Sequence, residues 1–291
     1  MEVSGRGYTA ATFAGGRTMY ATLADGFTQS VAIGDMFTNN RWGPTGLGFG
    51  PDGALLVANP TDGHLWRIAP DGTPDAEPVI RNLGAVGLVN LADGRVLATR
   101  EDGHELAELD LENGTMGRRY ASPFGRPVGA ALDPTSGRVL ITLLAVHALA
   151  WLDPESGEWT QAAAGPPLAR PDGIAFDAQG NAFIGSVGND RVVCLSRDGQ
   201  LSEVAAIGGE PDGIAVAAPS SPLNGAVLVS CHDGSLHRLD RVDGEWQSQV
   251  VAHSGSRGDH MAISPDGYLY LTQRDEVLRL GPPIFGPSAS A

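Results

Sequence analysis

The chain of 291 residues contains 40 glycines and 20 prolines, and its formal net charge is −15 because 34 acidic residues outnumber 19 basic ones. This many helix-breaking residues argues against a long coiled coil, and no apolar stretch is long enough to span a membrane. All 19 basic residues are arginines, which excludes Schiff-base and P-loop lysine chemistry. An acidic chain without a basic patch argues against nucleic-acid binding and suits cations or neutral small molecules.

The two cysteines, Cys194 and Cys231, are too few for a disulfide framework and form no Cys-x-x-Cys motif. We therefore expect two free thiols. The first 20 residues contain no apolar run of signal-peptide length, which favours a cytoplasmic protein. We expect a monomer that acts on a small molecule and has no nucleic-acid or membrane partner.

One five-residue phrase recurs along the chain every 40 to 47 residues, at 43–47, 84–88, 126–130, 170–174, 210–214 and, most weakly, 257–261. Each copy opens a unit of apolar runs that are separated by turns containing Gly. Four short strands joined by tight turns form one antiparallel sheet, and a period of about 40–45 residues is typical of a propeller blade. The sequence therefore predicts an all-β fold, a six-bladed β-propeller of four-stranded antiparallel blades with almost no helix.

The last unit, 258–280, contains only three strands, so the N-terminal region is expected to supply the fourth. Our candidate is Thr18–Leu23, whose pairing would close the ring and cover exposed strand edges. The segment 28–43 is then extra relative to the other joints between blades. The alternative is a seventh, degenerate blade built from residues 8–40. We expect residues 1–280 to form a single propeller domain and residues 281–291 to be a frayed tail.

The phrase begins the innermost strand of each blade, so its third residue belongs to a ring around one mouth of the central channel. In blade order the ring reads Thr45, Val86, Val128, Asp172, Asp212 and Asp259. Three converging carboxylates raise one another's pKa or bind a cation. Oxygen ligands suit Ca²⁺, Mg²⁺ or Mn²⁺, and Zn²⁺ is a further candidate. Alternatively, these aspartates only cap backbone N–H groups.

The loops between the second and third strands reach the same mouth and carry three candidate substrate-binding residues, Asn59, Arg100 and Arg274. Arg41 and Trp42, in the extra segment, are candidates for a substrate wall, although that segment can equally be a surface excursion. Arg100 or Arg41 can hold a substrate carboxylate.

Two histidines belong to adjacent blades at this mouth, and each is followed or preceded by an aspartate. They are His232 and His260, and either is a candidate general base. The alternative for a lone loop histidine is an ordinary solvated turn residue. His64, His104 and His147 lie on blades without ring carboxylates and are interpreted as structural.

The stretch from Pro171 to Asn181, with the sequence PDGIAFDAQGN, resembles the blade signature of the gluconolactonase/regucalcin (senescence marker protein) six-bladed propellers. Pro211–Val216 is a second copy, and the resemblance spans residues 43–280. Strictosidine-synthase-like enzymes and virginiamycin B lyase are similar in architecture. The resemblance implies an enzyme with one divalent cation at the channel mouth.

Gluconolactonase-type enzymes hold this cation with a first-blade Glu, two middle-blade Asn and a fifth-blade Asp. By blade order Asp212 matches that Asp and Asp172 replaces one Asn, whereas Thr45 and Val128 depart from the pattern. Asp259 can supply the missing charge from the sixth blade. The lyase family instead has catalytic His residues on inner strands, with a Glu ahead of one of them. His260 is the nearest analogue of such a His here, and Glu210 stands at the place of that Glu.

These observations predict a metal-dependent hydrolase of the lactonase type, acting on a small lactone or ester at the channel mouth. Asp212 is expected to act as ligand or base, Asp172 and Asp259 as further ligands, and His232 or His260 as proton shuttle. Two alternatives remain open. One is a lyase, cyclase or isomerase of specialised metabolism with His260 as base, and the other is a non-enzymatic binding propeller.

Overall fold

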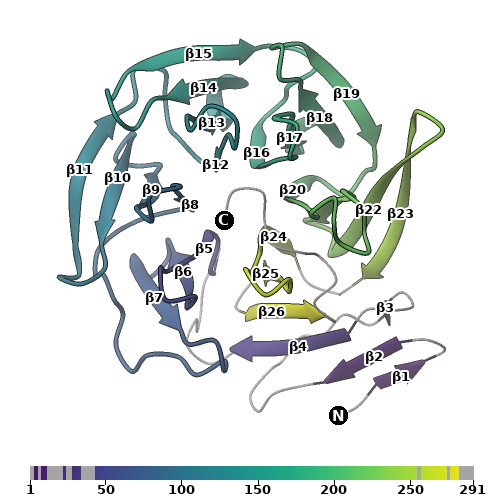
Figure 1. Cartoon of the computed structure of the whole chain (residues 1–291), viewed down its shortest axis with the longest axis horizontal. Helices are drawn as coiled ribbons and strands as arrows, with labels where there is room; N and C mark the ends of the chain where they lie inside the picture. Colours follow the sequence, from purple (N-terminus) through teal and green to yellow (C-terminus); the bar gives the residue numbers. More distant parts are fainter. Residues whose placement is uncertain are drawn as a thin grey trace.

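The structure, a computed structural model, arranges six β-sheets around a central channel (Figure 1). It describes the backbone of strands at 3–5, 8–11, 22–23 and 28–33, and all of residues 43–253, 257–273 and 276–281. Within these ranges the chain forms 26 strands and two single-turn 3₁₀ helices, η1 (Leu144–Val146) and η2 (Val187–Asn189). The prediction of an all-β six-bladed propeller with almost no helix is confirmed. The described part of the chain contains no helix with the length and apolar character needed to cross a membrane.

Blades two, three and four each have the predicted four antiparallel strands. The second blade consists of β8 (Gly87–Asn90), β9 (Val96–Arg100), β10 (Glu105–Asp110) and β11 (Thr115–Ala121). The third consists of β12 (Ala130–Leu132), β13 (Val139–Leu143), β14 (Ala148–Leu152) and β15 (Trp159–Ala164). The fourth consists of β16 (Pro171–Phe176), β17 (Ala182–Ser186), β18 (Arg191–Leu195) and β19 (Leu201–Ala206).

The first blade has one strand fewer than predicted. It consists of β5 (Leu47–Phe49), β6 (Leu55–Asn59) and β7 (His64–Ile68). The chain then runs along the edge of β7 and makes only two isolated bridges, Leu65 with Ile80 and Ile68 with Pro74. Prolines at 70, 74 and 78 interrupt this stretch, and a proline has no N–H to contribute to a ladder of hydrogen bonds.

The fifth blade is wider than predicted. It consists of β20 (Pro211–Val216), β21 (Val227–Cys231), β22 (Ser235–Val242) and β23 (Glu245–His253), and the short strand β3 (Thr22–Leu23) pairs antiparallel with β23. Thr22 and Leu23 therefore extend the fifth blade. Our assignment of Thr18–Leu23 to the sixth blade is wrong for these two residues, and residues 18–21 lie outside the described ranges.

The sixth blade is closed by another N-terminal strand. It consists of β24 (Gly258–Ile263), β25 (Leu269–Gln273) and β26 (Glu276–Gly281), and β4 (Thr28–Ile33) pairs antiparallel with β26. β2 (Tyr8–Ala11) lies parallel to β4, and β1 (Val3–Gly5) pairs antiparallel with β2. The first part of the supposed insertion is thus the closing strand, and it matches the six-residue length of β26. The strands of residues 8–40 join the fifth and sixth sheets, so the described residues form no seventh blade.

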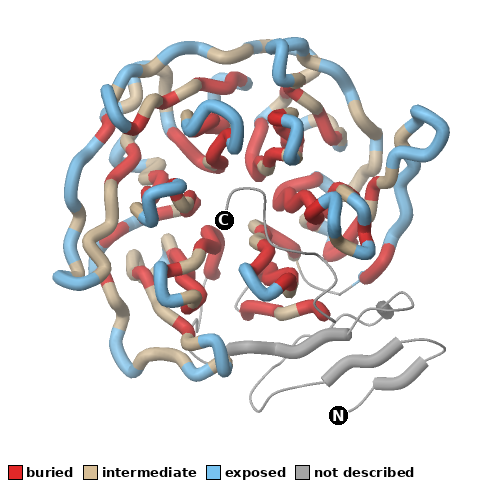
Figure 2. The backbone as a smooth tube through the Cα atoms, viewed as in Figure 1, coloured by how far each residue is buried: buried red, intermediate tan, exposed pale blue. Residues whose placement is uncertain are grey.

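Most of the core lies between neighbouring blades. The inner and second strands are buried, whereas the outer strands are largely exposed (Figure 2). Between the third and fourth blades, Leu140 and Leu149 pack with Ile174, Ile184 and Val193, and all five are buried. Each such side chain stabilises the fold by about 1.5–3 kcal/mol relative to an exposed one. The rigid inner strands that result position the residues at the channel mouth.

Both cysteines are free thiols, as predicted, with Cys194 on β18 and Cys231 at the end of β21. Burial raises the pKa of Cys194 to about 11 and that of Cys231 to about 12, so neither thiol is ionised near neutral pH. We expect thiol titration under denaturing, non-reducing conditions to find two thiols per chain, and the folded protein to react much more slowly. A titration that finds no thiol in the denatured chain would contradict this prediction.

Candidate functional site

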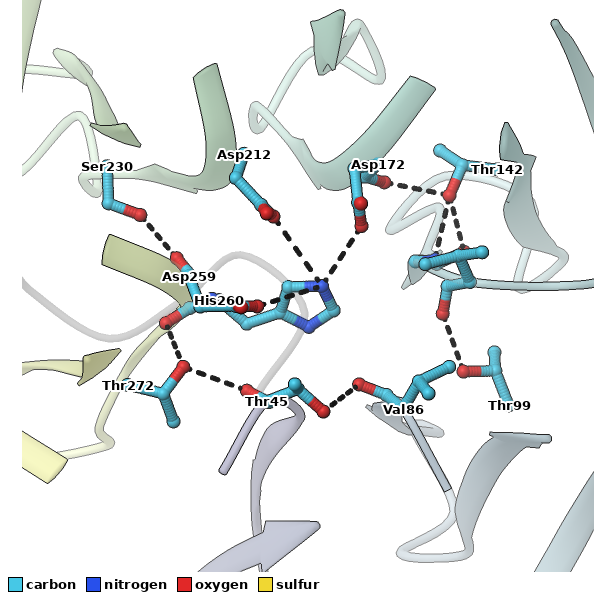
Figure 3. Close-up of polar contacts among 12 residues, drawn as sticks. Thr45, Val86, Thr99, Thr142, Asp172, Asp212, Ser230, Asp259, His260 and Thr272 are labelled. Atoms are coloured by element: carbon cyan, nitrogen blue, oxygen red, sulfur yellow. Dashed lines mark hydrogen bonds and ion pairs between the residues drawn. The ribbon is translucent and has the colours of Figure 1, made fainter. Parts of the chain in front are cut away.

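A belt of hydroxyl groups joins neighbouring blades at the channel mouth (Figure 3). In four blades, the fourth residue of the second strand donates a hydrogen bond from its hydroxyl group. The acceptor is the backbone carbonyl oxygen of the ring residue in the next blade. These bonds run from Thr99 to Val128 (2.5 Å), from Thr142 to Asp172 (2.7 Å), from Ser230 to Asp259, and from Thr272 to Thr45 (3.0 Å). Because the bonds hold the backbone of the ring, they fix where each ring side chain begins.

The residue after each ring position is Gly in five blades, at 46, 87, 129, 173 and 213. The inner strands approach so closely here that a Cβ at Gly129 or Gly173 would clash with the carbonyl oxygen of the next ring residue. The sixth blade has His260 at this position instead. Its imidazole reaches across the channel mouth toward the carboxylates of the other blades (Figure 3).

The imidazole of His260 faces all three ring carboxylates. Its Nε2 lies 3.2 Å from Oδ1 of Asp172, 3.8 Å from Oδ1 of Asp212 and 4.0 Å from Oδ1 of Asp259. The Asp212 side chain is only 1% exposed and that of His260 12%. The structure therefore brings together the three aspartates and His260, as the order of the phrases predicted.

A second group of charged side chains surrounds the other oxygen of Asp212. Nε2 of His232, in the loop after β21, lies 2.6 Å from Oδ2 of Asp212, and Nδ1 lies 3.0 Å from Oε2 of Glu210. Nη2 of Arg257 lies 2.8 Å from Nε2 of His232 and 3.6 Å from Oδ2 of both Asp212 and Asp259. His232 thus belongs to the same cluster as His260, with Asp212 between the two rings.

Sequence reasoning missed Arg257 as a functional candidate. The sequence contained a signal for Arg257, because this residue opens the sixth copy of the phrase just as Glu210 opens the fifth. Glu210 adopts a left-handed conformation with φ of 56°, and its backbone N–H donates to Oδ1 of Asp190 (2.9 Å). A non-glycine residue in this region costs about 1–3 kcal/mol and is typical of functional sites.

Burial and mutual charge shift the ionisation of this cluster. Burial and the charge of Asp212 raise the pKa of Asp172, and they raise that of Asp259 to about 7. Burial opposes ionisation of Asp212 too, but the hydrogen bond with His232 and the charge of His260 hold its pKa below the usual value. Burial disfavours the charged form of His260, yet the hydrogen bond to Asp172 and the three carboxylate charges raise its pKa to about 9.

The cluster has the ligands that a divalent cation needs. Asp172, Asp212 and His260 each offer one ligand atom, and these atoms lie within 4.8 Å of one another. Oδ1 of Asp212 is buried and has no hydrogen-bond partner among the described residues, and an unsatisfied buried charged oxygen costs several kcal/mol. Carboxylate and imidazole ligands suit Mn²⁺, Zn²⁺ or Mg²⁺. The residues present therefore fit such an ion, with His260 neutral when it binds.

Two of the predicted substrate-binding residues, Asn59 and Arg100, have structural contacts. Nδ2 of Asn59 donates to Asp62 (3.1 Å) within its own loop, and Nε of Arg100 donates to the carbonyl of Leu83 (2.7 Å). Arg100 also pairs with Glu105. No described contact joins either side chain to Asp172, Asp212 or Asp259. Three further candidates, Arg41, Trp42 and Arg274, lie outside the described residues.

Two histidines that we interpreted as structural accept backbone hydrogen bonds. Nδ1 of His147 accepts from the N–H of Arg170 (2.8 Å), and Nδ1 of His64 accepts from the N–H of Asn82 (3.4 Å). Both bonds hold the joints that lead into the next blade, which is consistent with a structural role.

The sequence matches no family model and no curated protein. Solved structures of similar shape include a gluconolactonase from Xanthomonas campestris, with 16% identity, coverage of 91% of this chain and 93% of that chain, and a TM-score of 0.72. Virginiamycin B lyase from Staphylococcus aureus has 14% identity, with 88% of this chain and 99% of that chain covered and a TM-score of 0.64. A chain of a nidogen/laminin complex has 19% identity, with 76% and 85% covered and a TM-score of 0.62. At such identities the likeness shows the fold alone: the chain shares its propeller fold with this gluconolactonase and with virginiamycin B lyase.

Proposed function

We propose that this protein is a metal-dependent hydrolase of the lactonase type, which opens a small lactone or ester at the channel mouth. The observation that carries the proposal is the buried Oδ1 of Asp212, which has no hydrogen-bond partner among the described residues and lies among the potential ligands Asp172 and His260. A cation at this place would satisfy that oxygen and take over the charge that His260 otherwise carries. The gluconolactonase of the same fold supports the substrate class.

Asp172, Asp212 and His260 would hold the cation, and Asp259 adds a third carboxylate beside them. A bound divalent cation supplies polarisation of the substrate carbonyl and a lowered pKa of a water molecule. The protein itself supplies the buried, preoriented side chains. The belt bonds to the carbonyls of Asp172 and Asp259 hold these two residues in place without any ion.

His232 is the residue best placed to move protons. Glu210 at Nδ1 and Asp212 at Nε2 fix the plane of its ring, and its side chain is 16% exposed. When Nε2 is unprotonated it can accept a hydrogen bond from Arg257, and when it is protonated it donates to Asp212. His232 can therefore take up a proton and return it without reorienting, as general acid–base catalysis requires.

Arg257 provides positive charge on the same side of the cluster. Its side chain is 32% exposed, and its Nη2 lies 3.6 Å from Oδ2 of both Asp212 and Asp259. A fixed guanidinium stabilises the negative charge that develops on an ester oxygen, and it can hold the carboxylate of the product.

A lyase is the second candidate, and a specific observation favours it. Arg257 already places positive charge beside Asp212 and Asp259 without a cation, and the neutral form of His260 could serve as the base of a metal-free elimination. Virginiamycin B lyase has the same fold, and one of its His-to-Ala variants is described as catalytically inactive.

The test is lactone hydrolysis with and without a divalent cation. We expect the wild type to consume the lactone, to lose this activity with a chelator and to regain it with Mn²⁺ or Mg²⁺. The same ions should raise the melting temperature, because a ligand at a hundredfold excess over Kd stabilises the folded state by about 2.7 kcal/mol. In water labelled with heavy oxygen, a hydrolase incorporates the label into its acid product. An unlabelled, unsaturated product formed despite the chelator would instead support the lyase.

A further inference from the structure

The channel mouth has two chemically different halves (Figure 3). Blades four to six place all three ring carboxylates on one half, and both histidines come from these blades. On the other half, blades one to three contribute Thr45, Val86 and Val128 to the ring. Val86 is half-buried and Val128 is 8% exposed. A molecule that reaches the carboxylates therefore lies against a wall of different character on its opposite side.

The hydroxyl groups on the second half are already engaged. Thr45 donates to the carbonyl of Val86 (2.8 Å), and Thr99 donates to the carbonyl of Val128 (2.5 Å). Thr142 donates to the carbonyl of Asp172 and accepts from the N–H of Gly129 (2.7 Å). A hydroxyl has a single proton to donate, so these three threonines hold the blades together and offer no donor to a ligand.

The rim above this half is apolar at the third blade. The loop there is η1, Leu144–Val146, and Val146 is 49% exposed. It lies beside the joint at Gly125, where an added Cβ would stand 3.7 Å from a Val146 methyl group. The corresponding loops of the second and fifth blades begin instead with polar residues, Glu101 and His232.

The charged rim residues near this loop are paired with one another. Nη1 of Arg126 lies 3.3 Å from Oε1 of Glu101, and Nη2 lies 3.6 Å from Oδ1 of Asp102. Glu101 and Asp102 therefore offset the charge of Arg126 at this rim.

On the basis of the proposed function, we infer that the substrate is a lactone or ester with an apolar substituent, alkyl or aromatic, which lies against blades one to three. The reactive carbonyl then faces Asp172, Asp212 and His260, and the substituent covers Val86 and Val146. A polyhydroxylated sugar lactone is a poor fit, because its hydroxyl groups would lose water against this wall without gaining partners. Each hydroxyl left unpaired disfavours binding, and sites discriminate strongly on this ground.

The experiment compares γ-lactones of increasing alkyl length with glucono-1,5-lactone, at fixed Mn²⁺. We expect kcat/KM to rise up to about fourfold per added methylene, the factor that corresponds to full burial of a CH₂ group, and gluconolactone to be the poorest substrate. Val146→Asn should flatten the dependence on chain length. The matched control is Val250→Asn, since Val250 is 50% exposed on the outer strand β23 and its replacement should leave the dependence unchanged.

The inference is overturned if gluconolactone is turned over faster than the alkyl lactones, or if Val146→Asn and Val250→Asn give the same dependence as the wild type. If the wild type hydrolyses no lactone, the proposed function fails, and calorimetric titration of the same compounds decides the inference separately. Binding that strengthens with alkyl length and weakens in Val146→Asn would support the apolar wall. Tighter binding of gluconolactone would refute it.

Discussion

Replacing Asp212 by Asn is expected to lower kcat/KM for a lactone by about a thousandfold or more, and to abolish stabilisation by divalent cations. The Asn side chain keeps the size of the Asp side chain but carries no negative charge. Oδ1 can no longer serve as an anionic ligand, and Oδ2 no longer fixes Nε2 of His232 at 2.6 Å. Loss of a metal site and of a positioned acid–base residue together exceeds the effect of either alone.

The stability of this variant separates loss of function from loss of fold. The charge of Asp212 raises the pKa of both Asp172 and Asp259, so its removal relieves repulsion among the carboxylates. This relief offsets the lost attraction to His232 and His260, which holds the pKa of Asp212 below its usual value. Without a cation we therefore expect Asp212→Asn to melt close to the wild type. The control is Asp266→Asn, in the hairpin between β24 and β25, where Asp266 accepts from the hydroxyl of Ser264. This control should keep both activity and the cation-dependent rise in melting temperature, and equal cation effects in the two variants would contradict the proposed site.

With a chelator present, the free energy of unfolding is expected to fall by about 3 kcal/mol between about pH 6.5 and pH 9. The pKa of His260 rises from 6.5 in the unfolded chain to about 9 in the folded protein. The stabilisation from its charged form is fully present below pH 6.5 and is lost as the pH rises through 9. The raised pKa of Asp259, about 7, acts in the same direction at lower pH, because its proton is held more tightly in the folded state.

A divalent cation should reverse this trend over the same pH range. Metal ligands must be deprotonated, so the cation competes with the proton on His260 and binds more tightly as the pH rises. Urea unfolding at about pH 6 and about pH 9, with chelator and with Mn²⁺, measures both effects. His260→Gln should remove most of the fall in the chelated protein. A fall that persists in this variant, or a cation effect that is equal at both pH values, would show that His260 is not the group involved.

The sequence by itself determined the number of blades and the ring of residues at the mouth. The signals for these are local, since the Gly-containing turns, the short apolar runs and the 40–47-residue period all repeat within single units. The position of a residue within its unit then determines its place in the blade, so the convergence of Asp172, Asp212 and Asp259 follows from their shared phrase position. The same comparison of phrases shows that His260 stands at a position where the five other blades have Gly.

Only the tertiary structure decided which N-terminal strand closes the ring and which side chains share Asp212. The pairing of β4 with β26 joins residues at opposite ends of the chain, and several apolar N-terminal segments have similar local propensity for a strand. The contacts of Arg257 with His232 and Asp259 likewise depend on distances between blades. The sequence assigned the polar groups of Asn59 and Arg100 to the substrate. In the folded protein these groups instead form hydrogen bonds with nearby residues, Asp62 and Leu83. Which of several possible partners a polar side chain binds depends on distances in the folded protein. The local pattern of residues does not contain these distances.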